Sequence, residues 1–133
     1  MKVYVFGNED SPLDKTAITV AGKMKKKFPQ VVFVEVGVNT DVQFDQNETT
    51  VIMDAVGGID KVELIENKDI NRVISSPSTS VHDFDLGFQL KYLKKLGKLG
   101  NVNIIGIPVD KKINYLRIQS ILRKLVAQDM QGS

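Results

Sequence analysis

The sequence predicts one open, doubly wound α/β domain with a mostly parallel sheet and helices on both of its faces. Three observations favour this fold class. Short apolar runs rich in β-branched residues recur along the chain, segments with helical spacing of apolar residues lie between them, and glycine or proline stands at several boundaries. Strands that alternate with amphipathic helices favour parallel crossovers, and right-handed crossovers bring such strands into an open sheet.

The first two predicted elements are a strand and a helix. Residues 2–6 form a short apolar run, which Gly7 ends. Over residues 13–28 the apolar side chains recur at helical spacing, and Pro12 suits the first turn of such a helix. Lysines gather near its C-terminal end, where the helix dipole favours cations, and Pro29 closes it.

The middle of the chain predicts strands. Residues 31–36 and 50–53 are apolar and rich in β-branched residues, and the second run leads directly into Asp54. Residues 61–65 and 71–74 are two further candidate strands, and we expect them to form an antiparallel hairpin at the edge of the sheet.

The last third predicts a helix, a strand and a second helix. The first helix begins near Asp83 and has leucines on one face and lysines largely on the other. Residues 101–107 are a buried strand. The apolar face of the final helix consists of Ile113, Leu116, Leu122 and Leu125. We find no linker or internal repeat, so residues 1–133 are expected to form a single domain, with 131–133 as a frayed end.

Composition excludes several classes of function. The 18 basic and 16 acidic residues give a net charge of only +2, which offers no reason to expect a nucleic-acid partner. The chain has no cysteine, so disulfides, thiolate nucleophiles and cysteine-based metal sites are excluded. The N-terminal apolar run is too short for a signal peptide or a membrane span. We therefore expect a cytoplasmic protein that does not insert into membranes.

Three segments carry side chains suited to chemistry at the carboxyl edge of the predicted sheet, where ligands of such folds collect. Asp14 lies at the start of the first helix, Asp54 follows an apolar strand, and His82 precedes a helix. Two carboxylates and an imidazole suit a divalent ion such as nickel, zinc or manganese. Three protein ligands also leave coordination positions open for a substrate group, as in catalytic metal sites.

Each of these residues alone also fits a structural role. Asp14 favours the positive end of its helix, Asp54 is a typical turn residue after a strand, and a lone histidine is more often structural than a ligand. Asp83 and Asp85 are typical of a helix start. The sequence lacks the glycine-rich phosphate-binding motifs, the GxSxG elbow and HExxH, which argues against nucleotide-binding, serine hydrolase and zincin functions.

The order of these segments resembles the hydrogenase maturation proteases, the endopeptidases that trim the large-subunit precursor of nickel–iron hydrogenases. In that family Gly-Asn ends the first strand and an acidic residue follows six positions later, as Asp14 follows Gly7-Asn8 here. The family's second acidic ligand follows an apolar strand, as Asp54 does, and its histidine lies in a Ser-x-His segment, as in Ser80-Val81-His82. A later strand of the type NIIGIPVD also matches.

The resemblance implies a function as well as a fold. Asp14, Asp54 and His82 are implied to contact nickel that is already installed in the hydrogenase large-subunit precursor, whose C-terminal extension is then removed, an aspartic-type, nickel-dependent peptidase activity. Gly7, Asn8 and Thr40 are the implied substrate contacts. The chain departs from the family where Leu13 and Lys15 flank the first ligand, and where the family's Asp-Gly-Gly-Thr is replaced by EVGVNT, residues 35–40.

Two alternatives remain open from the sequence. The first is a nickel-dependent assembly factor of the same fold, which binds the precursor without cutting it. The second is a small-molecule enzyme that binds an anion in residues 7–12, at a helix N-terminus. Glu9 and Asp14 argue against the second alternative, because carboxylates repel an anion.

Overall fold

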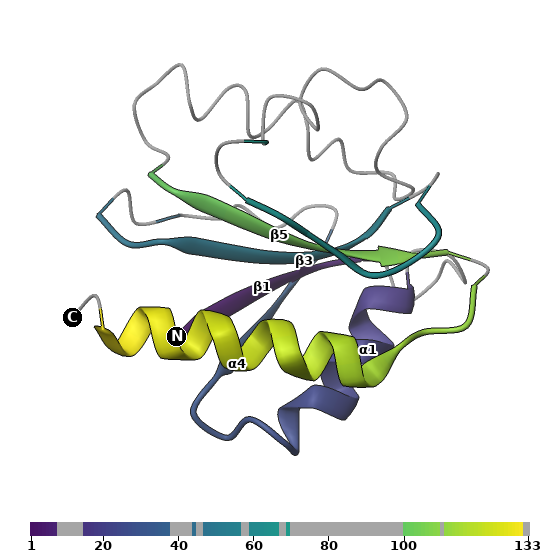
Figure 1. The fold of residues 1–133 in the computed structure, drawn as a ribbon, viewed down its shortest axis with the longest axis horizontal. Coiled ribbons are helices and arrows are strands. Elements are labelled where there is room, and N and C mark those ends of the chain that lie inside the picture. Colours follow the sequence, from purple (N-terminus) through teal and green to yellow (C-terminus); the bar gives the residue numbers. More distant parts are fainter. Residues whose placement is uncertain are drawn as a thin grey trace.

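Five strands form one mostly parallel sheet in the order β2-β1-β3-β5-β4 (Figure 1). The structure, a computed structural model, describes residues 1–7, 15–37, 44, 47–56, 59–66, 69, 100–109 and 111–131. In chain order the elements are β1 (Lys2–Phe6), α1 (Lys15–Lys25), β2 (Val32–Val36), β3 (Thr50–Val56), β4 (Glu63–Ile65), β5 (Val102–Pro108) and α4 (Tyr115–Gln131). The pairs β1–β2, β1–β3 and β3–β5 are parallel and β4–β5 is antiparallel, which confirms the predicted fold class.

The five predicted strands within these residues are all present, with differences at their ends. The main difference is in β3, which continues through Asp54 to Val56 because it pairs with β5 as far as Pro108. Asp54 therefore lies inside a strand and not in the turn after it. The antiparallel edge strand is confirmed as β4, but its partner is β5. The other half of the predicted hairpin, residues 71–74, lies outside the described residues.

Helix α1 confirms the predicted first helix in its described part and ends earlier than its apolar pattern. The backbone N–H groups of Lys27 and Phe28 both donate to the carbonyl of Met24, each at 3.0 Å, which closes the last turn. Proline at position 29 disfavours helical geometry in the residue before it, so the chain turns there and enters β2. Phe28 itself stays buried against the core.

Helix α4 confirms the predicted last helix but not its whole apolar face. Asn114 caps it, since its side-chain oxygen accepts a hydrogen bond from the backbone N–H of Arg117 at 3.1 Å. Leu116, predicted to be buried, is 75% exposed. It lies two residues before the buried Ile118 and therefore about 200° around the helix from it. Gln131, predicted to fray, is the last residue of α4, and 132–133 lie outside the described residues.

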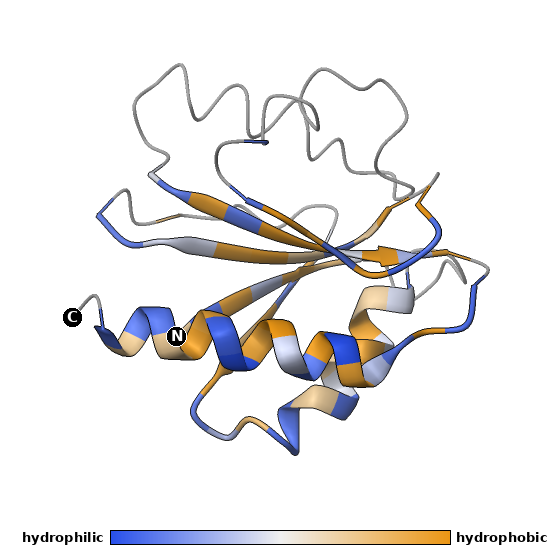
Figure 2. Cartoon of the chain, viewed as in Figure 1, coloured by the Kyte–Doolittle hydropathy of each residue, from blue (hydrophilic) through white to orange (hydrophobic). Residues whose placement is uncertain are grey.

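The sheet separates two apolar cores. Helices α1 and α4 both cover one face (Figure 1), where they pack against side chains such as Val5, Met53 and Ile105. The opposite face carries a second core that includes Phe6, Ile52 and Ile104. Figure 2 shows many hydrophobic residues along the strands, and hydrophobic and hydrophilic residues in turn along α4. The helix predicted from Asp83 lies outside the described residues.

None of the helices in the described part of the chain has the length and apolar character needed to cross a bilayer.

Candidate functional site

The topology creates one preferred ligand position in this sheet. Strand β1 has β2 on one side and β3 on the other. The chain therefore extends the sheet in one direction from β1 to β2 and in the opposite direction from β1 to β3, which makes the β1–β3 boundary a topological switch point. In open α/β sheets, ligands bind outside the carboxyl ends of the strands at this switch point. Gly7 ends β1 there, and its backbone N–H donates to the carbonyl of Val36 at 3.5 Å. The carboxyl ends of β1 and β3 therefore define the candidate site.

Asp54 lies on β3 close to its carboxyl end. Its exposed fraction is 1%. Among the described residues, Thr50 is the other polar or charged residue that is buried. Successive strand residues point to opposite faces, and Met53 belongs to the core under the helices. Asp54 therefore points to the face opposite α1 and α4. Aspartate is rarely buried this completely unless it serves a polar or metal partner, so its position favours a functional role.

The strand register places a glycine beside Asp54. On β5 its partner is Gly106, whose partner on β4 is Glu63. Residues in register share a face, so the two carboxylates lie on the same face with a glycine between them. A Cβ atom built on Gly106 would lie 3.3 Å from the side chains of both Ile59 and Val56. Position 106 therefore has room for a hydrogen atom but little room for a side chain.

Gly106 and Glu63 were not predicted as site residues. A glycine inside an apolar strand is a recognised sign of close approach by another group, so the sequence did contain a signal for Gly106. The alignment of Glu63 with Asp54 depends on the antiparallel pairing of β4 with β5, which periodicity alone does not give.

On the other side of Asp54, β1 supplies an apolar wall. The register pairs Val5 with Met53, and the next residue on β1, Phe6, is 1% exposed and belongs to the same core as Ile52. A carboxylate between packed apolar side chains is held in a fixed orientation and in a medium of low dielectric constant. Its interaction with a cation or a hydrogen-bond donor is stronger there than in water.

The other predicted site residues lie mostly outside the described ranges. This applies to Asn8, Asp14, Thr40 and His82, so their grouping with Asp54 stays a prediction. Lys15, which follows Asp14, begins α1. Because the chain leaves β1 at the carboxyl edge and enters β2 at the opposite edge, α1 begins near the carboxyl edge.

The described residues alone contain no group of three His, Cys, Asp or Glu side chains able to hold a metal ion.

Comparisons with known proteins identify the fold. No protein-family model matches the chain, and no curated protein has a significantly similar sequence. Among solved structures it is similar to the hydrogenase maturating endopeptidase HybD from E. coli, with a TM-score of 0.65 and 11% identity over 100% of this chain and 94% of that one. A hydrogenase 2 maturation peptidase from a Thaumarchaeota archaeon aligns with a TM-score of 0.46 and 19% identity over 98% of both chains. The likeness to HybD confirms the fold that the sequence resemblance implied.

Proposed function

We propose that this chain is an endopeptidase that recognises nickel in the precursor of a nickel–iron hydrogenase large subunit and removes its C-terminal extension. One observation carries the proposal: Asp54 is a buried carboxylate at the switch point of a sheet whose fold is that of a hydrogenase maturating endopeptidase. Open α/β sheets bind their ligands at this position, whereas packing of the apolar core does not require a carboxylate there.

The nickel belongs to the substrate in this proposal. Asp14, Asp54 and His82 would supply two carboxylate oxygens and one imidazole nitrogen, a donor set that suits nickel. Contact with the metal would anchor the precursor so that its scissile peptide bond lies beside the site, and holding reactants together lowers the barrier to reaction. Gly7, Asn8 and Thr40 would contact the peptide.

Burial gives Asp54 a specific part in this scheme. Its backbone is fixed by pairing with β5, and its side chain is enclosed by the sheet's second face. A ligand that is already oriented loses little entropy when the metal arrives, so this geometry favours recognition of a precisely placed ion. We further propose that the protein works in the cytoplasm, a reducing compartment with which a cysteine-free chain is compatible.

The test is a cleavage assay on nickel-loaded hydrogenase large-subunit precursors, read by mass spectrometry. Asp54→Asn keeps the shape of the side chain and removes its charge, and we expect it to lower the cleavage rate by about 100-fold or more. Asp60→Asn is the matched control, because the same change falls on a side chain that is 95% exposed. Its rate should equal that of the unchanged protein.

Two results would contradict the proposal. Normal cleavage by Asp54→Asn, with the fold intact by circular dichroism, would remove Asp54 from the mechanism. A stable complex with the nickel-loaded precursor and no loss of mass would instead support the assembly factor.

A further inference from the structure

The charges of this chain are divided unevenly between two parts of the fold. Residues 15–28 and 111–131, which contain α1 and α4, hold ten of the 18 basic residues and one of the 16 acidic residues, a formal charge of +9. The rest of the chain holds eight basic and 15 acidic residues, a formal charge of −7. The small net charge of the protein therefore hides a strong asymmetry.

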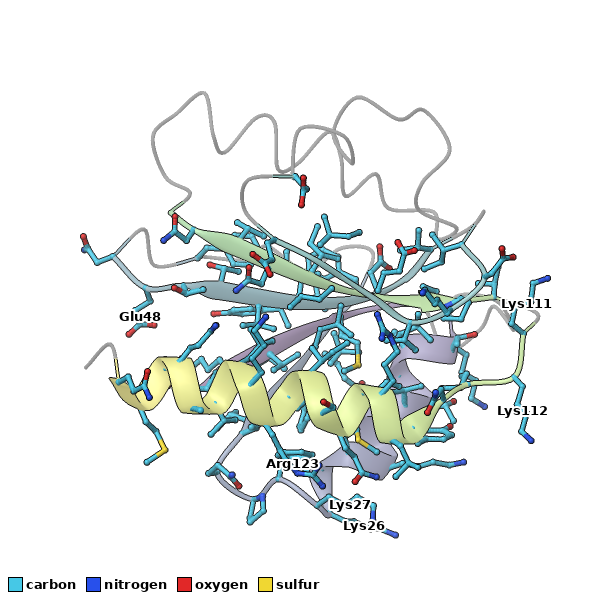
Figure 3. The ribbon with its side chains drawn as sticks, viewed as in Figure 1. Lys26, Lys27, Glu48, Lys111, Lys112 and Arg123 are labelled. Atoms are coloured by element: carbon cyan, nitrogen blue, oxygen red, sulfur yellow. The ribbon has the colours of Figure 1, made fainter. Side chains whose placement is uncertain are left out.

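The fold collects these two ranges into one layer, here called the basic layer. Both helices cover the same face of the sheet (Figure 1), and the ammonium group of Lys23 on α1 lies 4.7 Å from the centre of the Tyr115 ring on α4. Figure 3 shows Lys26, Lys27 and Arg123 directed away from the sheet. All ten cations of the basic layer are exposed.

Few of these cations are neutralised within the described residues. Lys111 lies 3.9 Å from Asp60 and Lys124 lies 3.7 Å from Glu66, both as exposed pairs that contribute little. The layer's one acidic residue, Asp129, is 3.8 Å from the N-terminal ammonium group of Met1. In the described part of the chain, the exposed lysines at positions 25–27 take part in no ion pair.

Folding explains only part of this charge distribution. Lys23 and Lys25 lie in the last turn of α1, where the helix dipole favours cations. At α4 the situation is reversed, because Lys112 and Arg117 lie near its N-terminal end, and no acidic residue occurs in its first turn. Cations at that end oppose the dipole. Arg117 has a structural role, since its Nε–H donates to the carbonyl of Val62, but Lys112 has none in the described residues.

We propose that the basic layer is a docking surface for the acidic surface of a protein partner. Eight of its ten cations are lysines, whereas arginine is the usual choice for bidentate phosphate contacts. Its two aromatic residues are not available for base stacking, because Phe28 is buried and Tyr115 lies under Lys23. The apolar sides of both helices pack on the sheet, so they cannot enter a bilayer. Leu116, exposed among the cations, supplies an apolar contact that a protein partner buries.

The outer side of this surface lies apart from Asp54. Helices α1 and α4 cover one face of the sheet and Asp54 points to the other, so a partner on the outer side of the helices leaves the Asp54 face open. Lys15, at the start of α1, is the cation of the layer that adjoins the proposed site residue Asp14. The inference does not rest on the proposed peptidase activity. Asp54→Asn should leave docking unchanged, which separates a failure of one proposal from a failure of the other.

The test uses fluorescently labelled poly-L-glutamate as the probe and measures its binding to the full chain by anisotropy, at low and at physiological ionic strength. We expect Lys26→Glu/Lys27→Glu to weaken binding by about tenfold or more, and added salt to weaken binding to the unchanged protein. The matched control is Lys2→Glu/Lys61→Glu, which changes net charge equally at two exposed positions outside the layer. It should weaken binding by no more than about twofold.

A second variant separates a loss of probe binding from a loss of stability. Lys112→Glu removes a cation that opposes the dipole of α4, so it should weaken probe binding while the melting temperature stays equal or rises. Equal loss of binding in both double variants would show an effect of net charge alone and overturn the proposal. Absence of binding would also overturn it, as would tighter binding to double-stranded DNA or to phosphatidylserine vesicles than to the polypeptide probe.

Discussion

At the scale of single residues, Asp54 is the feature that most needs a physical explanation. Transfer of a carboxylate from water into an apolar setting costs several kcal/mol unless a cation or hydrogen-bond donors compensate. Its neighbours Ile52, Val56 and Phe6 are apolar and buried. In the proposed function, nickel in the precursor would give this buried carboxylate a charged ligand.

Gly106, the partner of Asp54 on β5, lies close to the side chains of Ile59 and Val56. We predict that Gly106→Val lowers the free energy of unfolding by about 1–3 kcal/mol, because its methyl groups would overlap Ile59 and Val56. Urea denaturation measures this change.

A double variant tests the cause of that loss. Ile59→Ala removes one of the two groups in contact with position 106, so Ile59→Ala/Gly106→Val should lose less stability than the two single changes added together. Strict additivity would show that crowding by Ile59 is not the reason.

At the scale of elements, α4 packs against the sheet through one of its faces. Its buried residues are Ile118, Ile121, Leu122, Leu125 and Val126. We predict that Leu122→Ala, at a fully buried position, lowers the free energy of unfolding by about 2–5 kcal/mol. Leu116→Ala makes the same chemical change on the same helix at an exposed position and should change stability by less than about 0.5 kcal/mol. Thermal or urea denaturation of both variants checks the pair, and equal losses would contradict the assigned helix face.

The elements also show which sequence signals were sufficient. Residues 2–6 and 101–107 are short runs rich in apolar and β-branched residues, which favours buried strands, and the structure has β1 and β5 at these positions. Leu116 was misjudged because spacing from Ile113 and Leu122 allows more than one helix face. The phase of α4 is set by its packing on the sheet through Ile118 and Leu122, which is a tertiary effect.

At the scale of the whole molecule, the sequence predicted the class of the sheet but not its registers. Asp54 was predicted to come directly after the third strand, whereas β3 continues through it to Val56 and leaves it two residues short of the strand's end. Its alignment with Gly106 and Glu63 depends on the pairing of β3, β5 and β4, which arises only when the strands assemble. The charge asymmetry was present in the sequence as lysine-rich stretches, but only the fold brings residues 15–28 and 111–131 into one layer.

The molecule as a whole thus carries two surfaces with different chemistry. A buried carboxylate marks the edge of one face of the sheet, and a dense set of exposed cations covers the other. Changes at Lys26 and Lys27 should leave the Asp54 face intact, since sites far apart without shared partners act almost independently.

The most direct test of the central claim compares one hydrogenase large-subunit precursor with and without nickel, incubated with the protein and analysed by mass spectrometry. We predict loss of a C-terminal peptide from the nickel-loaded precursor only, and no loss with His82→Ala, whose circular dichroism spectrum should match that of the unchanged protein. Cleavage that is equally fast without nickel, or that persists in His82→Ala, would contradict the claim.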